Sequence, residues 1–197
     1  MKSGVFTNST KKHNNMSKKV LLTLTALVFS TSMFAQIFMA KTCEVSFFSA
    51  SPLENIEAIN KASKPLVNTS TNDVQIKIVN TAFIFEKPLM QEHFNENYME
   101  SDKYPNTIFK GKINEKIDWA KDGENKVTIT GKMSMHGVDK DITFDGVVTI
   151  KGGEITIAAK FKVHIADYGV KVPSLYIQNI AEDVDVKLHA VLAPFKK

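Results

Sequence analysis

The stretch LMQEHFNENYMESDKYPNTIFKG, residues 89–111, is the part of the chain where the apolar period changes. Pro88 suits the first turn of a helix, where its missing N–H needs no partner, and Pro105 bars a helix from continuing. Thr107–Ile113 alternates as a strand does. The residues spaced as one helical face are Leu89, Met90, His93, Phe94 and Asn97. The stretch therefore predicts one short helix set among strands.

Alternating apolar and polar residues recur on both sides of this helix. The runs predicted as strands are residues 43–50, 73–86, 107–117, 127–135, 142–150, 155–165 and 184–192. The apolar phase shifts near residues 80–82, which predicts a bulge or bend. His136–Lys140 and Gly152-Gly153 are predicted hairpin connections. Repeated period two predicts a mainly β fold, an eight-stranded antiparallel lipocalin-like barrel wide enough for one small ligand.

A second short helix is predicted near the barrel opening. Ser51 and Glu54 have the spacing of a capping box, and Leu53, Ile56 and Ile59 would share one side of a helix that ends near Lys61. The fold prediction therefore includes one or two short helices.

Composition excludes several classes of partner. All 25 basic residues are lysine, so the arginine fork that reads bases and phosphates is missing, which argues against nucleic-acid binding. Removing the five lysines of residues 1–35 leaves 20 basic residues against 21 acidic ones, so the net charge of +4 belongs to the leader. Cys43 is the single cysteine, which excludes an intramolecular disulfide. The chain length suits a single domain.

Residues 16–35 have the pattern of a secretory signal peptide. Lys18 and Lys19 precede a ten-residue apolar run, and Ala35 is a plausible cleavage point. Residues 1–15 are interpreted as an upstream extension and residues 36–197 as one barrel domain. We expect an exported protein, periplasmic or extracellular, without a stable transmembrane segment after cleavage. The alternative, an uncleaved anchor, is disfavoured because the apolar run is too short to span a bilayer, and Lys41 disfavours lipidation at Cys43.

Catalytic and metal-binding motifs are scarce, so the sequence predicts no enzyme, no metal site and no required cofactor. The histidines at 93, 136, 164 and 189 lack metal-ligand spacing. His93, with Glu92 and Glu96 nearby, is a candidate ligand or base, and the pair of His93 with Glu96 is the best acid–base candidate. A histidine that only hydrogen-bonds a loop or a ligand head group is the favoured interpretation.

Aromatic and methionine side chains at inward positions predict a binding cavity. Any single one is more often core than ligand contact, but together they suit a flexible apolar chain. Gly131, Gly146, Ala159 and Ala190 would leave room among them. The candidate ligand-binding residues are Phe83, Phe85, Met90, His93, Phe94, Tyr98, Phe109, Met133, Met135, Phe144 and Phe161.

Four strings resemble the YceI-like family of exported lipocalin-like barrels: HFNENYMESDKYP, the FKG that follows, GKMSMHGVDKDITF, and ADYGV with its downstream proline. The resemblance implies a barrel with a helix at its opening and, in some members, a polyisoprenoid tail inside. A polyprenol or quinone is then the expected ligand, with His93, Asn95 and Tyr98 near its head group. The alternative is an exported barrel with a filled core that acts through its surface in stress response. A homodimer through an uncovered strand edge stays open, although no long flat apolar edge is evident.

Overall fold

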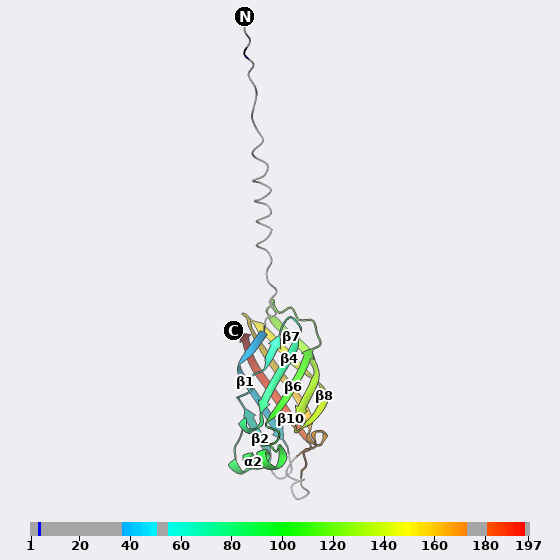
Figure 1. Cartoon of the computed structure of the whole chain (residues 1–197). Coiled ribbons are helices and arrows are strands. Elements are labelled where there is room, and N and C mark those ends of the chain that lie inside the picture. Colours follow the sequence, from blue (N-terminus) through cyan, green and yellow to red (C-terminus); the bar gives the residue numbers. More distant parts are fainter. Residues whose placement is uncertain (1–3, 5–36, 51–54, 173–180, 196–197) are drawn as a thin grey trace. The chain divides into compact units, whose positions relative to one another are not determined.

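The chain divides into two units, Met1–Phe34 and Ala35–Lys197. The computed structural model describes residues 4, 37–50, 55–172 and 181–195, so the expected signal peptide lies outside the described residues. The described part of the second unit is one antiparallel sheet that closes on itself because β1 pairs with β10 (Figure 1). The elements are β1 (Ile37–Ser49), β2 (Ile56–Asn60), β3 (Leu66–Asn68), β4 (Asp73–Val79), η1 (Asn80–Ala82), β5 (Phe83–Phe85), α2 (Pro88–His93), η2 (Phe94–Tyr98), β6 (Asn106–Ile113), β7 (Gly123–Met135), β8 (Val138–Lys151), β9 (Glu154–His164), η3 (Ile165–Tyr168) and β10 (Asp183–Pro194).

The ten strands occupy eight positions around the barrel. β2 and β3 both pair with β1, one after the other, and so form one interrupted strand. β4 pairs with β3 and β5 pairs with β2, which makes β4 and β5 the next interrupted strand. From β6 to β10 each strand pairs with the one that follows. The predicted eight-stranded barrel is confirmed.

Two buried asparagines replace the hydrogen bonds that the interrupted strands lose. Asn60 donates from Nδ2 to the carbonyl of Val79 at 2.9 Å, and its Oδ1 accepts from the backbone of Ala62 at 2.9 Å. Asn80 donates from Nδ2 to the carbonyl of Tyr104 at 2.7 Å, and its Oδ1 accepts from the hydroxyl of Thr107 at 3.0 Å. Buried backbone groups must be paired somewhere, so these amides make the breaks tolerable.

The predicted bend at residues 80–82 is the 3₁₀ turn η1, and the predicted helix is α2 continued by the π-helical turn η2. The second predicted helix is wrong: Ile56–Asn60 is strand β2, and Leu53 lies outside the described residues. Ile56 and Ile59 are three residues apart, which suits one face of a helix, whereas in β2 they lie on opposite faces of the strand. Pairing with β1 on one side and β5 on the other supplies hydrogen bonds that a single helical turn could not match.

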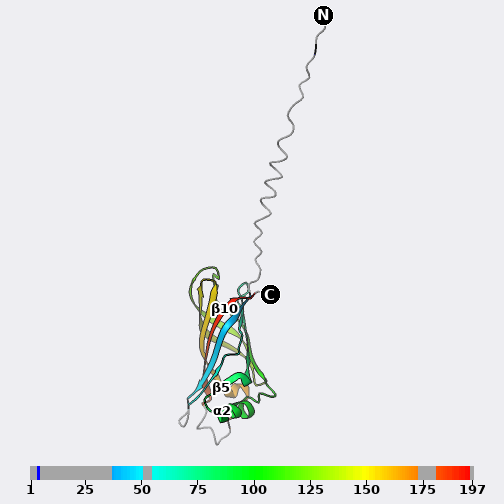
Figure 2. The same cartoon turned by 90° about the vertical axis from the view of Figure 1, so that its left-hand side faces the viewer.

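The barrel interior differs between its two ends. At the end away from α2, buried aliphatic side chains occupy the interior, and the largest of them are Ile113, Ile129, Ile155, Ile157 and Leu192, each less than 2% exposed. Such packing leaves no room for a ligand. The other end carries α2 and β5, which lie together in the view of Figure 2, and its inward side chains are larger and more exposed.

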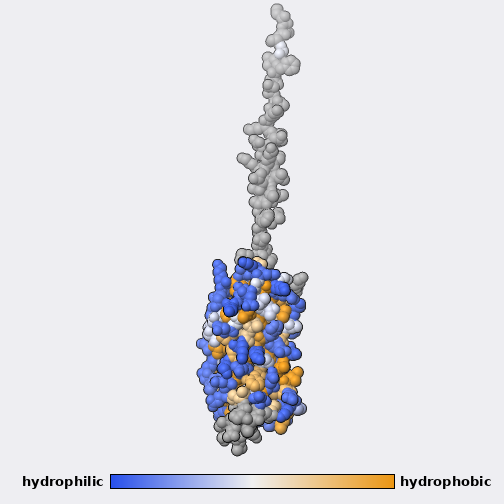
Figure 3. Space-filling model, turned by 180° about the vertical axis from the view of Figure 1, so that it is seen from behind, coloured by the Kyte–Doolittle hydropathy of each residue, from blue (hydrophilic) through white to orange (hydrophobic). Residues whose placement is uncertain are grey.

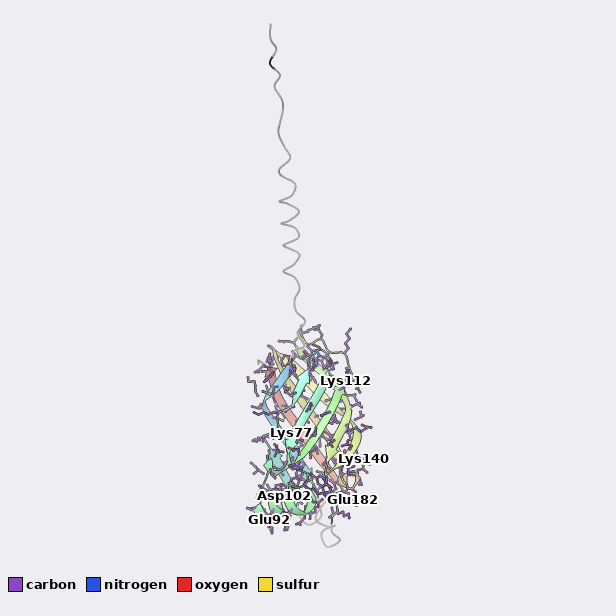
Figure 4. The ribbon with its side chains drawn as sticks, in the orientation of Figure 1. Lys77, Glu92, Asp102, Lys112, Lys140 and Glu182 are labelled. Atoms are coloured by element: carbon purple, nitrogen blue, oxygen red, sulfur yellow. The ribbon has the colours of Figure 1, made fainter. Side chains whose placement is uncertain are left out.

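The outer surface carries the charges. Figure 3 shows mainly hydrophilic side chains with apolar ones scattered among them on the reverse face. Figure 4 labels Lys77 and Lys112 on the barrel wall and Glu92 and Asp102 at the end that carries α2. Within the described residues, no helix is long and apolar enough to cross a membrane.

We predict that Asn80→Ala lowers the free energy of unfolding by about 2–4 kcal/mol, because the buried partners of the amide lose their hydrogen bonds. Asn114→Ala is the control: this side chain bonds Thr130 Oγ1 at 3.0 Å on the exposed surface, and its loss should cost less than about 1 kcal/mol. Urea denaturation of both variants measures the difference. Equal costs would contradict the structural role of Asn80.

Candidate functional site: an apolar cavity beneath a helical lid

A cavity of about 460 Å³ fills the end of the barrel that carries α2 and η2. Its volume lies within the range of roughly 300–1,000 Å³ that is usual for small-molecule sites. Nearly all of its wall is apolar, and the exceptions are Ser49, Asn80, Lys87, His93 and Thr107, with the Tyr98 hydroxyl. The amide of Asn80 is already bonded within the barrel. The site is therefore suited to an apolar group rather than to a charged substrate.

Four phenylalanine rings fasten the lid to the barrel. Phe94, at the junction of α2 and η2, stacks on Phe47 of β1 with ring centroids 5.5 Å apart. The same ring meets Phe83 at 5.5 Å and Phe85 at 5.0 Å, both on β5. Aromatic pairs at such distances add about 0.5–1.5 kcal/mol each beyond simple burial. Dispersion and burial, rather than polar contacts, thus hold Phe94 over the cavity.

Asn95 maintains the shape of the lid and is not placed as a head-group contact. Its Nδ2 donates to the carbonyl of Gln91 at 2.9 Å, and its Oδ1 accepts from the hydroxyl of Ser101 at 2.7 Å. The backbone of Met99 closes the π-helical turn on the carbonyl of Phe94 at 2.8 Å. Single π-helical turns are rare and often occur at functional sites. Of the three residues expected near a head group, only His93 and Tyr98 line the cavity.

Nine of the eleven candidate ligand-binding residues lie in the cavity wall. They are Phe83, Phe85, Met90, His93, Phe94, Tyr98, Met133, Met135 and Phe161. Phe109 and Phe144 are not among the wall residues. Their rings pack on each other at 5.4 Å, and Phe144 also stacks against Phe161 at 4.4 Å. Contact with a ligand itself stays a prediction for all eleven.

The small inward residues do not create the cavity, contrary to the sequence-based expectation. Gly111 and Gly131 are paired across β6 and β7, and the ring of Phe109 lies over both. A Cβ on Gly111 would come within 2.5 Å of Phe109 Cζ. Gly146 is covered by Ile129 and Ala159, and Ala190 is fully buried. These positions accept neighbouring side chains instead of leaving space for a ligand.

Sequence reasoning missed part of the cavity wall. Phe47 of β1 meets three rings of the lid cluster, and it follows Cys43 and Val45 at period two, so its inward direction could have been read from the sequence. Val184 and Val186 of β10 also line the cavity. Their alternation was recognised, but nothing in the sequence separates a wall residue from a core residue.

A polar latch joins three elements at the lid end. His136, in the β7–β8 hairpin, lies with Nε2 2.9 Å from Glu100 Oε2 and with Nδ1 3.0 Å from the carbonyl of Tyr168. Both partners can only accept, so the imidazole bonds both of them when it is doubly protonated. Tyr104 packs edge-on against the same imidazole at 4.7 Å. The latch therefore ties the segment after η2 to the hairpin and to η3.

Three of the four strings singled out in the sequence meet at this latch: one supplies Glu100 and Tyr104, one supplies His136, and one supplies Tyr168. A family model for the YceI-like domain matches residues 14–192 of the chain. The chain belongs to the YceI-like family. Among proteins with curated functional descriptions, none matches it.

Solved YceI-like structures resemble this barrel at low sequence identity. A polyisoprenoid binding domain from Saccharophagus degradans, described as implicated in plant cell wall breakdown, has a TM-score of 0.69 at 14% identity, over 82% of this chain and 99% of that one. BcnA from Burkholderia cenocepacia has a TM-score of 0.64 at 19% identity, over 76% and 95%. A Campylobacter jejuni YCEI protein has a TM-score of 0.58 at 17% identity, over 75% and 90%. These likenesses establish the fold.

The acid–base hypothesis finds little support at the lid of this YceI-like barrel. Glu92 and Glu96 are exposed and do not line the cavity, whereas His93 does. Within the described residues, no three His, Cys, Asp or Glu side chains gather as metal ligands. Burial raises the pKa of the Cys43 thiol to about 11, which keeps the thiol protonated and unreactive.

Gly137→Ala tests the hairpin that carries the latch. Gly137 has φ +77°, and a Cβ there would approach Tyr104 Cε1 to 2.6 Å. Gly152, in the other two-residue hairpin, has φ +58° and no atom within 4 Å of such a Cβ. We expect Gly152→Ala to cost about 1 kcal/mol, from backbone strain alone, and Gly137→Ala about 2 kcal/mol or more. Thermal unfolding of the two variants measures the difference between their losses of stability. Equal losses would show that Tyr104 does not press on the hairpin.

Tyr168→Phe tests an unpaired group near the latch. Tyr168 is 3% exposed, and its hydroxyl has no hydrogen-bond partner within the described residues. Burial, with a smaller contribution from Asp167, raises the pKa of this phenol to about 12. Removing an unsatisfied buried hydroxyl should stabilise the fold by about 1 kcal/mol. A loss of stability in urea denaturation would mean that the hydroxyl has a partner in solution.

Proposed function

We propose that this YceI-like protein binds and carries a long-chain isoprenoid or a related amphipathic lipid, such as a polyprenol or a quinone. The observation that carries the proposal is the apolar cavity of about 460 Å³ beneath the lid. Each CH₂ buried there stabilises a bound tail by about 0.8 kcal/mol before ordering costs. The structural likeness to a polyisoprenoid binding domain supports the same class of ligand.

The proposed orientation puts the tail inside the barrel and the head group at the lid. The inner Phe, Met and Val side chains hold the tail, while His93, Tyr98 and Lys87 are the polar side chains that reach the cavity from the lid segment. Because the far half of the barrel is filled by side chains, only the lid-end half receives the tail. We infer that a tail too long for this half has to leave part of itself outside the cavity.

The proposed location is outside the cytoplasm, after cleavage of residues 16–35. This part of the proposal rests on the sequence pattern of the leader. A barrel that acts only through its surface is the second candidate, and the filled half of the interior favours it. A binding-type fold and a wall poor in polar groups support a non-catalytic role in either case.

Native mass spectrometry of the mature protein from its own host, followed by organic extraction, tests the carrier function. We expect a stoichiometric added mass that extracts as an isoprenoid or quinone. Val186→Trp should weaken binding of added geranylgeraniol at least about tenfold by filling the cavity, since Val186 pairs with Phe47 and Phe161 on the neighbouring strands. Val191→Trp, on the outer face of the same strand, is the control.

An apo mass would contradict the proposal if added polyprenols and quinones also failed to shift the mass or raise the melting temperature. Equal effects of the two tryptophan variants on binding would move the ligand away from the cavity. Either result would favour the surface-acting barrel.

A further inference from the structure

The barrel wall is open between β8 and β9 over the lid-end half. These two strands pair only from Gly146 with Ala159 to Lys151 with Glu154. Beyond that ladder, β8 stays paired with β7 as far as Val138, and β9 stays paired with β10 as far as His164. Within the described residues, the stretches 138–145 and 160–164 therefore face each other without a shared ladder. Elsewhere at this level the described strands are joined by ladders, apart from β5, which pairs with β2 only and is contacted by α2 of the lid.

Aromatic rings, and no ladder, close this gap. Phe144 of β8 and Phe161 of β9 would be partners if the ladder continued by two residues, and their rings stack 4.4 Å apart at an interplanar angle of 21°. Phe161 lines the cavity. Both rings remain partly exposed. The stack therefore borders the cavity, and neither of its rings is fully buried.

The gap has defined upper and lower limits. Above it, the ladder begins at the small pair Gly146 and Ala159. Below it, η3 bridges back to β8, where Lys140 lies 3.8 Å from Asp167 and His136 meets the carbonyl of Tyr168. Seven of the eight strand positions each contribute at least one described side chain to the cavity wall, and β8 contributes none. The lower half of β8 thus lies outside the cavity wall and packs on η3, and the gap in the ladder between β8 and β9 is the window.

The outer margins of the window carry opposite charges that do not meet. Asp141 and Asp145 point outward from β8, and Lys160 and Lys162 point outward from β9. The ion pair of Lys162 runs to Asp185 on β10, at 3.5 Å. Among the described residues, no ion pair links the two margins. Within the described part of the chain, the two sides are therefore joined by an ion pair only at the lower limit of the window, where Lys140 meets Asp167.

The lid is fastened more firmly than the window. Moving the lid means separating Phe94 from three other rings and breaking the bond between His136 and Glu100. Opening the window means separating the Phe144 ring from Phe161 and from Phe109, and no ladder hydrogen bond between β8 and β9 has to break there. Rotations of partly exposed side chains are also much faster than movements of a packed helix.

We propose that the window between β8 and β9 is a lateral passage through which the apolar tail of the ligand enters and leaves the cavity, with the Phe144–Phe161 stack as its gate. The passage rests on the proposed carrier function. It allows a tail to slide sideways into the barrel while the lid and latch stay in place. It also gives a tail longer than the cavity a route out of the wall.

Cross-linking the window tests the passage. The variant Asp145→Cys with Lys160→Cys places two outward thiols directly below the last ladder pair, and a short bis-maleimide joins them. The matched control is Val147→Cys with Ala158→Cys, which are paired within the ladder. The native Cys43 is buried and does not compete. The readout is transfer of tritiated geranylgeraniol from loaded protein to excess phosphatidylcholine vesicles.

We expect cross-linking of the window pair to slow transfer at least about tenfold and cross-linking of the control pair to leave the rate unchanged. Phe144→Ala, which removes half of the gate, should speed transfer several-fold. Equal rates in the two cross-linked proteins would overturn the passage and assign exchange to the lid.

Ligand-free protein provides a second test that does not depend on the carrier function. Ile142→Cys faces inward beside the window, and Ile150→Cys faces inward on the same strand within the ladder. We expect a maleimide to label the first at least about tenfold faster than the second. Equal, slow labelling with normal ligand binding would overturn the passage alone. Fast labelling at Ile142→Cys with no binding of geranylgeraniol would overturn the carrier function while the opening in the wall stands.

Discussion

The buried amides of Asn60 and Asn80 are the constraint on which the architecture of this barrel depends. At their level two neighbouring strands stop, and each amide satisfies the backbone groups that the break exposes. Beyond the break, β2 and β5 form a separate pair that carries Phe83 and Phe85 to the lid. Without a satisfied break, the two strands would run straight, and the lid would lose the rings on which Phe94 rests.

The same level separates a filled interior from a hollow one. On the far side, branched aliphatic side chains interlock, and Phe109 occupies the space over Gly111 and Gly131. On the lid side, the rings gather around Phe94 and leave the middle of the barrel open. A filled half stabilises the fold whether or not a ligand is bound. The hollow half can therefore be built for binding at little cost to the stability of the whole.

Period two and the helical spacing of residues 88–97 were enough to predict the barrel and its lid. They could not show which inward residues line a cavity, because Phe109 and Phe161 obey the same alternation. The difference comes from their neighbours: the Phe109 ring covers Gly111 on its own strand and Gly131 on the next strand, while Phe161 lies where β8 has left β9. Ile56–Asn60 was misjudged because the spacing of its two isoleucines is helical, and pairing with β1 and β5 overrides that local pattern.

The latch shows most clearly what lies beyond local pattern. Glu100, His136 and Tyr168 come from segments more than thirty residues apart, and only the closed barrel brings them together. The sequence strings that contain these residues were singled out because they resemble the family, and the sequence alone gave no role for the three side chains. In the structure, the His136 imidazole joins two segments to the β7–β8 hairpin: the residues that follow η2, and η3 itself. Within the described residues, the latch holds the lid end of the barrel together, while the lower halves of β8 and β9 share no ladder.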